Sequence, residues 1–293
     1  MANLKEVRVR ITSVNSTQQI TKAMKMVSAA KLRRAQDAIV QMRPYASKLK
    51  EILENVAESV DASGSGVFAS VRPENKILVV AVTSNRGLAG AFNANVIRTI
   101  NRMMNDTYSA QVKAGNFKIL CIGKKATDFF NKNKNCYVGN HNELYNHLNF
   151  ANVAVVAEDI MKEYAAGKYD KVIVVYNQFK NAAVQFVITE QLLPITPPAK
   201  KEKSKVVNDY IFEPDQESIV LDLIPKSIKT QLYKAVLDSH ASEHGARMTA
   251  MSKATDNAGE LIKELKLQYN KARQAAITNE ILEIVGGAEA LNG

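Results

Sequence analysis

Two histidines and a glutamate lie close together in the last quarter of the chain, at His240, Glu243 and His244. On a helix, the two histidines would lie one turn apart on the same face. Their order is that of the His-x-x-Glu-His motif of inverted zinc peptidases, in which both imidazoles bind the metal. A working zinc site also needs a third ligand and a cleft. A five-residue motif is also short enough to occur by chance. We therefore interpret both histidines as polar residues on the surface of a helical rod and expect no bound metal.

A glycine-containing loop at residues 83–93 follows an apolar run and precedes a helical stretch. Backbone N–H groups at such a strand-to-helix turn often bind phosphate. The loop lacks the Gly-Lys-Ser/Thr ending of a P-loop, and no Gly-x-Gly-x-x-Gly motif follows a strand elsewhere. We therefore interpret Gly87 and Gly90 as backbone requirements of a tight turn. The sequence predicts no cofactor and no catalytic residue.

Both ends of the chain carry the spacing of paired helices. Apolar or small residues recur in steps of three and four at residues 4–14 and 35–60, and again at residues 248–276. Heptad spacing is typical of helices that pair through one apolar face, and two such helices separated by a folded insert can pair only by folding back. The sequence predicts an antiparallel two-helix coiled coil formed by an N-terminal helix at residues 1–60 and a C-terminal helix at residues 209–293.

Three residues interrupt the second helical region. Proline has no N–H and disrupts a helix interior, so we expect Pro225 to open the long helix at its first turn, after a shorter helical piece at residues 215–223. Gly286 and Gly287 are expected to mark the point where the helix weakens.

Between the two helical regions, short β-branched runs alternate with helical stretches. Strands are expected at residues 76–83, 117–122 and 171–176, and helices at residues 91–105, 124–131 and 150–166. A further strand at residues 184–189 follows a loop too short for a crossover helix, so it should be an antiparallel edge strand. The fold class is therefore α/β plus long helices, with a Rossmann-like α/β domain at residues 76–194 inserted in the coiled coil. A flexible charged linker is expected at residues 195–208.

Positive charge is concentrated at the start of the chain. The chain has a formal net charge of +10. Residues 1–50 hold eleven Lys and Arg but only two acidic residues, Glu6 and Asp37. A basic helix favours an acidic partner, which could be nucleic acid, an anionic membrane surface or an acidic protein loop. The helix lacks interleaved aromatic residues and a recognised nucleic-acid-binding signature, so we expect no nucleic acid. No apolar run approaches 18 residues, so we expect no direct membrane span.

Residues 11–27 closely resemble the opening helix of the gamma subunits of bacterial F-type ATP synthases, and residues 241–281 are similar to the closing signature of the same family. Residues 191–194 and 210–214 also resemble the family, so the similarity extends from end to end. The resemblance implies the central rotor shaft, a non-catalytic subunit that transmits torque from ion flow to the catalytic ring. Its implied location is peripheral, on the cytoplasmic face of the bacterial inner membrane.

The resemblance also implies partners and contact residues. The partners are the alpha and beta subunits of the ring, the epsilon subunit and the membrane rotor ring. Five residues would contact mobile loops of the catalytic ring: Met24, Lys25, Arg247, Gln274 and Thr278. Because the second helix is the longer one, its last part should extend past its partner and need an apolar sleeve from another subunit. The apolar residues of this bearing tip are Ile277, Ile281, Leu282, Ile284, Val285 and Leu291.

Overall fold

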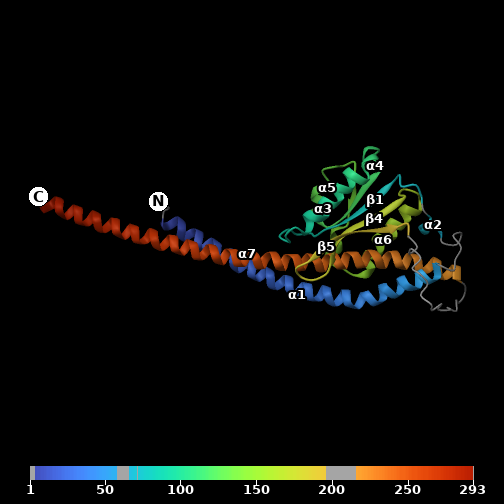
Figure 1. The fold of residues 1–293 in the computed structure, drawn as a ribbon, viewed down its shortest axis with the longest axis horizontal. Helices are drawn as coiled ribbons and strands as arrows, with labels where there is room; N and C mark the ends of the chain where they lie inside the picture. Colours follow the sequence, from blue (N-terminus) through green and yellow to red (C-terminus); the bar gives the residue numbers. More distant parts are fainter. Residues whose placement is uncertain (1–3, 58–65, 71, 196–215, 293) are drawn as a thin grey trace. The chain divides into compact units, whose positions relative to one another are not determined.

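The fold is known from a computed structural model that describes residues 4–57, 66–70, 72–195 and 216–292 (Figure 1). Most of the predicted linker at residues 195–208 therefore lies outside the described residues. The chain divides into two compact units. The larger unit comprises residues 30–246, and the smaller unit comprises residues 1–29 together with residues 247–293. Helices α1 (Leu4–Ala57) and α7 (Gln216–Asn292) each contribute to both units.

Helix α7 continues without a break through Pro225 and through Gly286 and Gly287. Our prediction that the long helix starts at Pro225 is therefore wrong. A proline removes one backbone hydrogen bond from a helix, but tertiary packing can hold the neighbouring turns in place. Here Ile224 and Ile228, on either side of the proline, are buried in the core of the larger unit.

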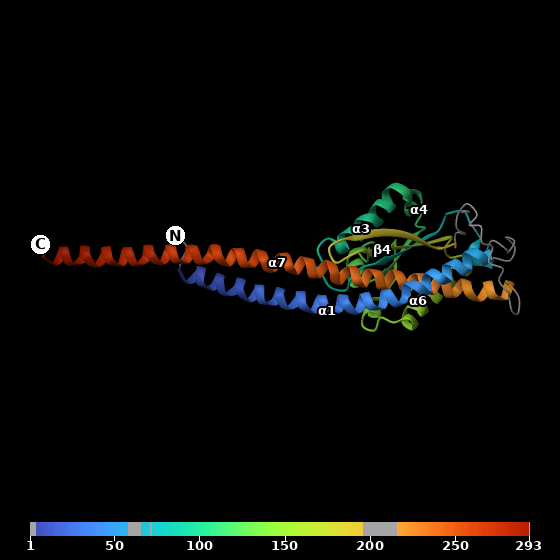
Figure 2. The same ribbon diagram turned by 60° about the horizontal axis from the view of Figure 1, so that its bottom comes forward.

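In the smaller unit, α1 and α7 pair in antiparallel orientation. The guanidinium of Arg8 donates a hydrogen bond to the Tyr269 hydroxyl (2.9 Å), and the Lys25 ammonium donates one to Ser252 Oγ (3.0 Å). The residue numbers on α7 thus decrease as those on α1 increase, which shows that the two helices run in opposite directions. The buried residues between the helices include Val7, Met251, Ala258 and Leu265. Both views show α7 extending past the start of α1 (Figures 1 and 2). The predicted antiparallel coiled coil is confirmed.

The larger unit contains a five-stranded sheet in the order β3-β2-β1-β4-β5. Its strands are β1 (Ile77–Val82), β2 (Phe117–Ile122), β3 (Tyr137–Asn140), β4 (Lys171–Phe179) and β5 (Gln185–Leu193). The first four strands are parallel, and β5 pairs with β4 in antiparallel orientation. The predicted antiparallel edge strand is thus confirmed, whereas β3 was not predicted.

The remaining elements of the larger unit are short. They are α2 (Gly66–Ala69), α3 (Phe92–Arg102), a π-helical turn (Met103–Thr107), α4 (Ser109–Lys113), α5 (Lys124–Phe130), a 3-10 turn (Asn142–Tyr145) and α6 (Phe150–Ala165). Helices α3, α5 and α6 coincide with the three predicted helices within a few residues, which is the usual scatter of helix ends.

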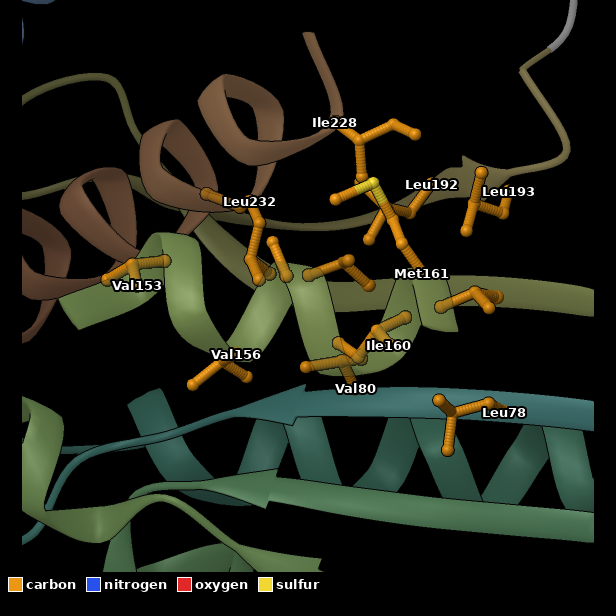
Figure 3. Packing of buried hydrophobic residues seen from close by; sticks show 14 of the residues in the cluster. Leu78, Val80, Val153, Val156, Ile160, Met161, Leu192, Leu193, Ile228 and Leu232 are labelled. Atoms are coloured by element: carbon orange, nitrogen blue, oxygen red, sulfur yellow. The ribbon is translucent and has the colours of Figure 1, made fainter. Parts of the chain in front are cut away.

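Both faces of the sheet are covered by helices. All six residues of β1 are buried, as expected for a central parallel strand. On one face, Leu78 and Val80 pack with residues of α6 and α7 (Figure 3). On the other face, residues of β1 and β2 pack with Val96 and Ile100 of α3 and with residues of α5. Because Ile228 and Leu232 of α7 belong to the first cluster, the C-terminal helix completes the core of the inserted domain.

Candidate functional site

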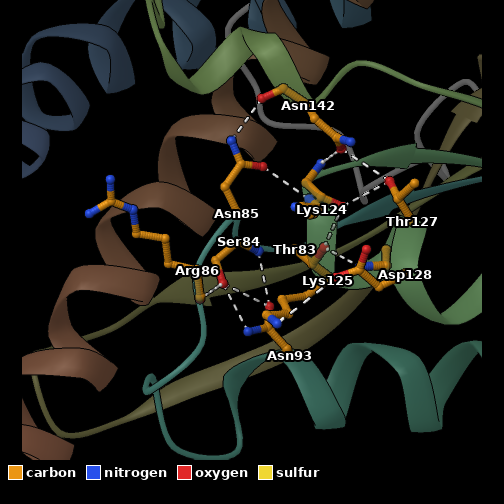
Figure 4. A network of polar contacts seen from close by, with 12 residues as sticks. Thr83, Ser84, Asn85, Arg86, Asn93, Lys124, Lys125, Thr127, Asp128 and Asn142 are labelled. Atoms are coloured by element: carbon orange, nitrogen blue, oxygen red, sulfur yellow. Dashed lines mark hydrogen bonds and ion pairs between the residues drawn. The ribbon is translucent and has the colours of Figure 1, made fainter.

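The loop at residues 83–93 lies at the carboxyl end of β1, where open α/β sheets commonly bind ligands. Its side chains instead bind the protein (Figure 4). Thr83 Oγ1 accepts a hydrogen bond from the Ala126 N–H (3.0 Å), and the side-chain oxygen of Asn85 accepts one from the Lys124 N–H (2.9 Å). The carbonyl of Ser84 accepts the N–H of Lys125 (3.1 Å).

The N-terminus of α5 is therefore already satisfied from within the chain. A helix start binds phosphate through N–H groups that lack a partner in the helix, and here residues 83–85 occupy those of Lys124, Lys125 and Ala126. Asn142 adds a further hydrogen bond at this helix start, because its side-chain oxygen accepts the Gly123 N–H (3.1 Å). The arrangement supports a structural turn rather than a nucleotide site.

The histidine pair lies in the larger unit and is not on a rod surface. His244 is 5% exposed and the neighbouring Glu243 is 7% exposed, so our interpretation of His244 as a surface residue is wrong, while His240 is half-buried. The Nε2 atoms of His240 and His244 are 3.2 Å apart, and the His240 ring stacks on Tyr145 at 5.8 Å between centroids. The burial arises because this part of α7 packs on the α/β domain, which residue spacing along one helix does not reveal.

A hydrogen bond between two imidazoles needs one ring to donate and the other to accept, so at least one ring is neutral. Within the described ranges, no group of three or more His, Cys, Asp or Glu side chains is placed to hold a metal ion. The pair therefore forms a packed polar contact between α7 and the domain.

We expect His244→Ala to lower the stability of the chain by about 1 to 3 kcal/mol, because it removes a buried, hydrogen-bonded ring. The matched control is His147→Ala, since His147 is exposed and its removal should change stability by less than about 0.5 kcal/mol. Thermal unfolding and metal analysis of both purified variants and the parent chain test this. One zinc per parent chain that is lost in His244→Ala would contradict it.

The five predicted contact residues all lie in the smaller unit, in two groups. Met24 is half-buried and Lys25 is exposed. The contact between Lys25 and Ser252 places both beside the part of α7 that begins with Arg247. Gln274 and Thr278 are exposed, and Thr278 Oγ1 donates to the Gln274 carbonyl (2.9 Å). They lie about 40 Å further along α7 than Arg247, at 1.5 Å per residue.

Arg247 differs from the other four because its side chain is only 7% exposed. A partner can reach this guanidinium only through its small exposed part or after the side chain turns outward. Lys25, Gln274 and Thr278 are accessible as they stand.

The end of α7 is an exposed apolar segment. Arg8 contacts Tyr269, and the described part of α1 begins four residues earlier, at Leu4. Beyond about residue 273, α7 therefore extends past the described end of α1. Every residue from 277 to 288 is exposed. Five apolar side chains in this segment are 48 to 71% exposed, namely Ile277, Ile281, Leu282, Ile284 and Val285. The side chain of Leu291, also predicted for the tip, lies outside the described residues.

A model of a family described as ATP synthase matches residues 3–291. A protein of Flavobacterium johnsoniae named ATP synthase gamma chain is 59% identical over the full length of both chains. The protein of the same name from Cytophaga hutchinsonii is 55% identical, also over both full lengths. The chain belongs to the ATP synthase gamma-chain family.

Solved structures related to the family share the fold. A chain in a Euglena gracilis mitochondrial ATP synthase, in a structure of OSCP, F1 and c-ring, has a TM-score of 0.70 at 23% identity. The match covers 98% of this chain and 94% of that one. A chain from the central stalk and c-ring of the Tetrahymena thermophila enzyme has a TM-score of 0.60 at 26% identity, covering 80% of this chain and 99% of that one. Among the described residues, no helix is both long and apolar enough to cross a membrane.

An exposed apolar row on α1 was missed by the sequence reasoning. Ile20 and Val27, one heptad apart, are 59% and 57% exposed, and Met26 beside them is also exposed. The signal was present as a second set of apolar positions beside the paired seam. In a family that functions within an assembly, such a row indicates a surface for another subunit.

Proposed function

We propose that this chain is the central rotor shaft of an F-type ATP synthase and transmits torque between a membrane rotor ring and a catalytic ring of alpha and beta subunits. The observation that carries the proposal is the full-length match to gamma chains, together with an antiparallel helix pair that ends in an exposed apolar tip. The epsilon subunit and the rotor ring are its further partners. In this proposal the complex lies at the cytoplasmic face of a bacterial inner membrane, with this chain peripheral to it.

In this function the chain itself is not catalytic. Torque transmission requires that the shaft contact each catalytic subunit differently, so that each rotational position stabilises a different open or closed state. The smaller unit is suited to this because its two helices present different residues. Lys25 lies on one helix, while Gln274 and Thr278 lie on the other.

The load on these contacts is considerable. Each elementary charge that crosses the membrane supplies about 2.3 kcal/mol per 100 mV, so a step driven by a few charges stores several kcal/mol. An exposed ion pair contributes about 0 to 1 kcal/mol and would not hold alone. The torque must therefore be distributed, with Met24, Lys25 and Arg247 in one group and Gln274 and Thr278 in the other.

We expect Arg247→Gln to leave assembly of the complex intact and to lower its ATPase turnover about three- to tenfold, because a charged contact with an acidic loop is lost in the rotating complex. Lys113→Gln, which makes the same charge change at an exposed site on α4, is the matched control and should keep its turnover. Both are measured by affinity purification of the complex followed by ATPase assay.

Since Arg247 is nearly buried, the variant could also weaken the shaft itself, so Lys25→Gln is measured alongside. This exposed residue should show a loss of turnover of about two- to threefold with unchanged assembly. Failure of Arg247→Gln to assemble, with Lys25→Gln fully active, would contradict the role given to these residues. The proposed function as a whole fails if the tagged chain, purified from its own cells, brings down no catalytic-ring subunits.

A further inference from the structure

A pocket of about 460 Å³ lies at the amino-terminal edge of the sheet, opposite the loop at residues 83–93. Its lining comes from the residues that enter β1, β2 and β4 and from the start of β3. The residues important here are Lys76, Asn116, Lys118, Lys168 and Tyr169. All of them lie in the larger unit, so the pocket belongs to one compact body.

Three lysines and no acidic residue line this pocket. The Lys76 ammonium donates to the Gly167 carbonyl (3.1 Å), and the Lys118 ammonium donates to the Asn135 carbonyl (2.8 Å). Carbonyl groups satisfy one hydrogen-bond donor each but do not neutralise a positive charge. Among the described residues, Lys168 alone of the three pairs with a carboxylate, that of Glu163 (2.6 Å). Two lysines without such a partner in the described part of the chain therefore border the pocket.

An acidic residue, Asp170, follows the lining residue Tyr169 in the chain. Its carboxylate accepts a hydrogen bond from the Lys76 backbone N–H (2.9 Å). Asp170 reduces the positive potential without removing it, because Lys76 and Lys118 both lack a carboxylate partner among the described residues. The balance favours an anion over a neutral ligand.

We propose that this pocket binds the phosphate group of a phosphorylated ligand. Lysine binds phosphate as a point charge, and two such charges beside one space favour a doubly charged oxyanion over a single carboxylate. The volume exceeds that of an orthophosphate ion, so the pocket has room for a second phosphate or an organic group. A soluble phosphorylated compound and a phospholipid headgroup share this chemistry.

The test uses the full chain and two probes. Pyrophosphate binding is measured by calorimetry, and vesicle binding by co-sedimentation with phosphatidylcholine vesicles that contain or lack phosphatidylglycerol. The key variant is Lys76→Gln with Lys118→Gln. The control is Lys113→Gln with Lys124→Gln, which removes the same charge from exposed positions outside the pocket.

We expect the Lys76/Lys118 variant to bind at least tenfold more weakly to whichever of the two probes the parent chain binds. The affinity of the control should remain within twofold of that of the parent chain. Pyrophosphate binding with this pattern identifies a soluble ligand, and binding only to vesicles with phosphatidylglycerol identifies a lipid headgroup. Equal losses in both double variants would reflect surface charge alone and would overturn the proposal. Absence of binding to either probe would also overturn it.

Discussion

Deletion of residues 283–293 is expected to reduce recovery of the assembled complex sharply, while the complexes that do form keep their coupled turnover. The deletion removes Ile284 and Val285, which are exposed in the free chain, together with Leu291. Burial of each such side chain contributes about 1.5 to 3 kcal/mol. These side chains are only partly exposed in the free chain, so loss of the two described ones makes the free energy of association less favourable by about 2 to 4 kcal/mol. The affinity of the chain for its partner then falls on the order of 30- to 1,000-fold.

Turnover should survive because apolar contact around a helix is distributed and nondirectional, so it holds the tip without opposing rotation. Subunit co-purification and ATPase turnover are measured on the same preparations. The double variant Ile284→Gln with Val285→Gln should reproduce the assembly defect at full chain length. Asn279→Ala with Glu280→Ala, at exposed polar positions of the same helix, is the control. A truncated chain that assembles normally but is uncoupled would show that the tip transmits torque.

A second large effect is expected at Gly123, between β2 and α5. Gly123 has φ of 110°, a conformation that L-residues rarely adopt, and a Cβ there would lie 2.1 Å from the carbonyl oxygen of Thr83. The clash is with backbone, so it cannot be relieved by rotating a side chain. Strain and overpacking together predict that Gly123→Ala destabilises the chain by about 3 to 5 kcal/mol.

Gly90→Ala is the matched control for this substitution. Gly90 also has a positive φ (58°), but a Cβ there would meet no atom within 4 Å. Only the left-handed backbone is unfavourable, which costs about 1 to 2 kcal/mol. Urea unfolding of both variants and the parent chain measures the difference. Equal destabilisation by the two substitutions would show that Thr83 moves away from the added Cβ. The hydrogen-bonded contact of Thr83 with Gly123 and Ala126 would then not be rigid.

Strongly periodic elements were predictable from the sequence. The two heptad regions, the three long parallel strands and the antiparallel β5 follow from the period of apolar residues and from loop length. The start of α6 also has a local signal, because the Asn149 side chain accepts the N–H of Asn152 (2.8 Å). Strand β3 was missed because it has four residues, contains Gly139 and has alternately exposed positions, so its pairing with β2 defines it more than its composition does.

The errors share a physical cause, which is tertiary packing that overrides local preference. Pro225 disfavours a helix interior, but the buried isoleucines around it hold α7 continuous. His240 and His244 have the composition of a polar helix face, yet the α/β domain covers that face. The near-burial of Arg247 was equally hidden, because one sequence does not reveal which residues of a long helix are covered. The pocket at the amino-terminal edge combines residues far apart in sequence and had no motif.

The sharing of α7 between the two units limits how far this chain could be simplified by protein engineering. A minimal shaft made by joining the two long helices through a short linker would lose the sheet and α6. That design would leave a row of large apolar side chains on α7 without cover, at Ile224, Ile228, Leu232 and Val236. Uncovered rows of this kind cause self-association. An engineered shaft would therefore need polar replacements at these four positions before it could be handled as a separate protein.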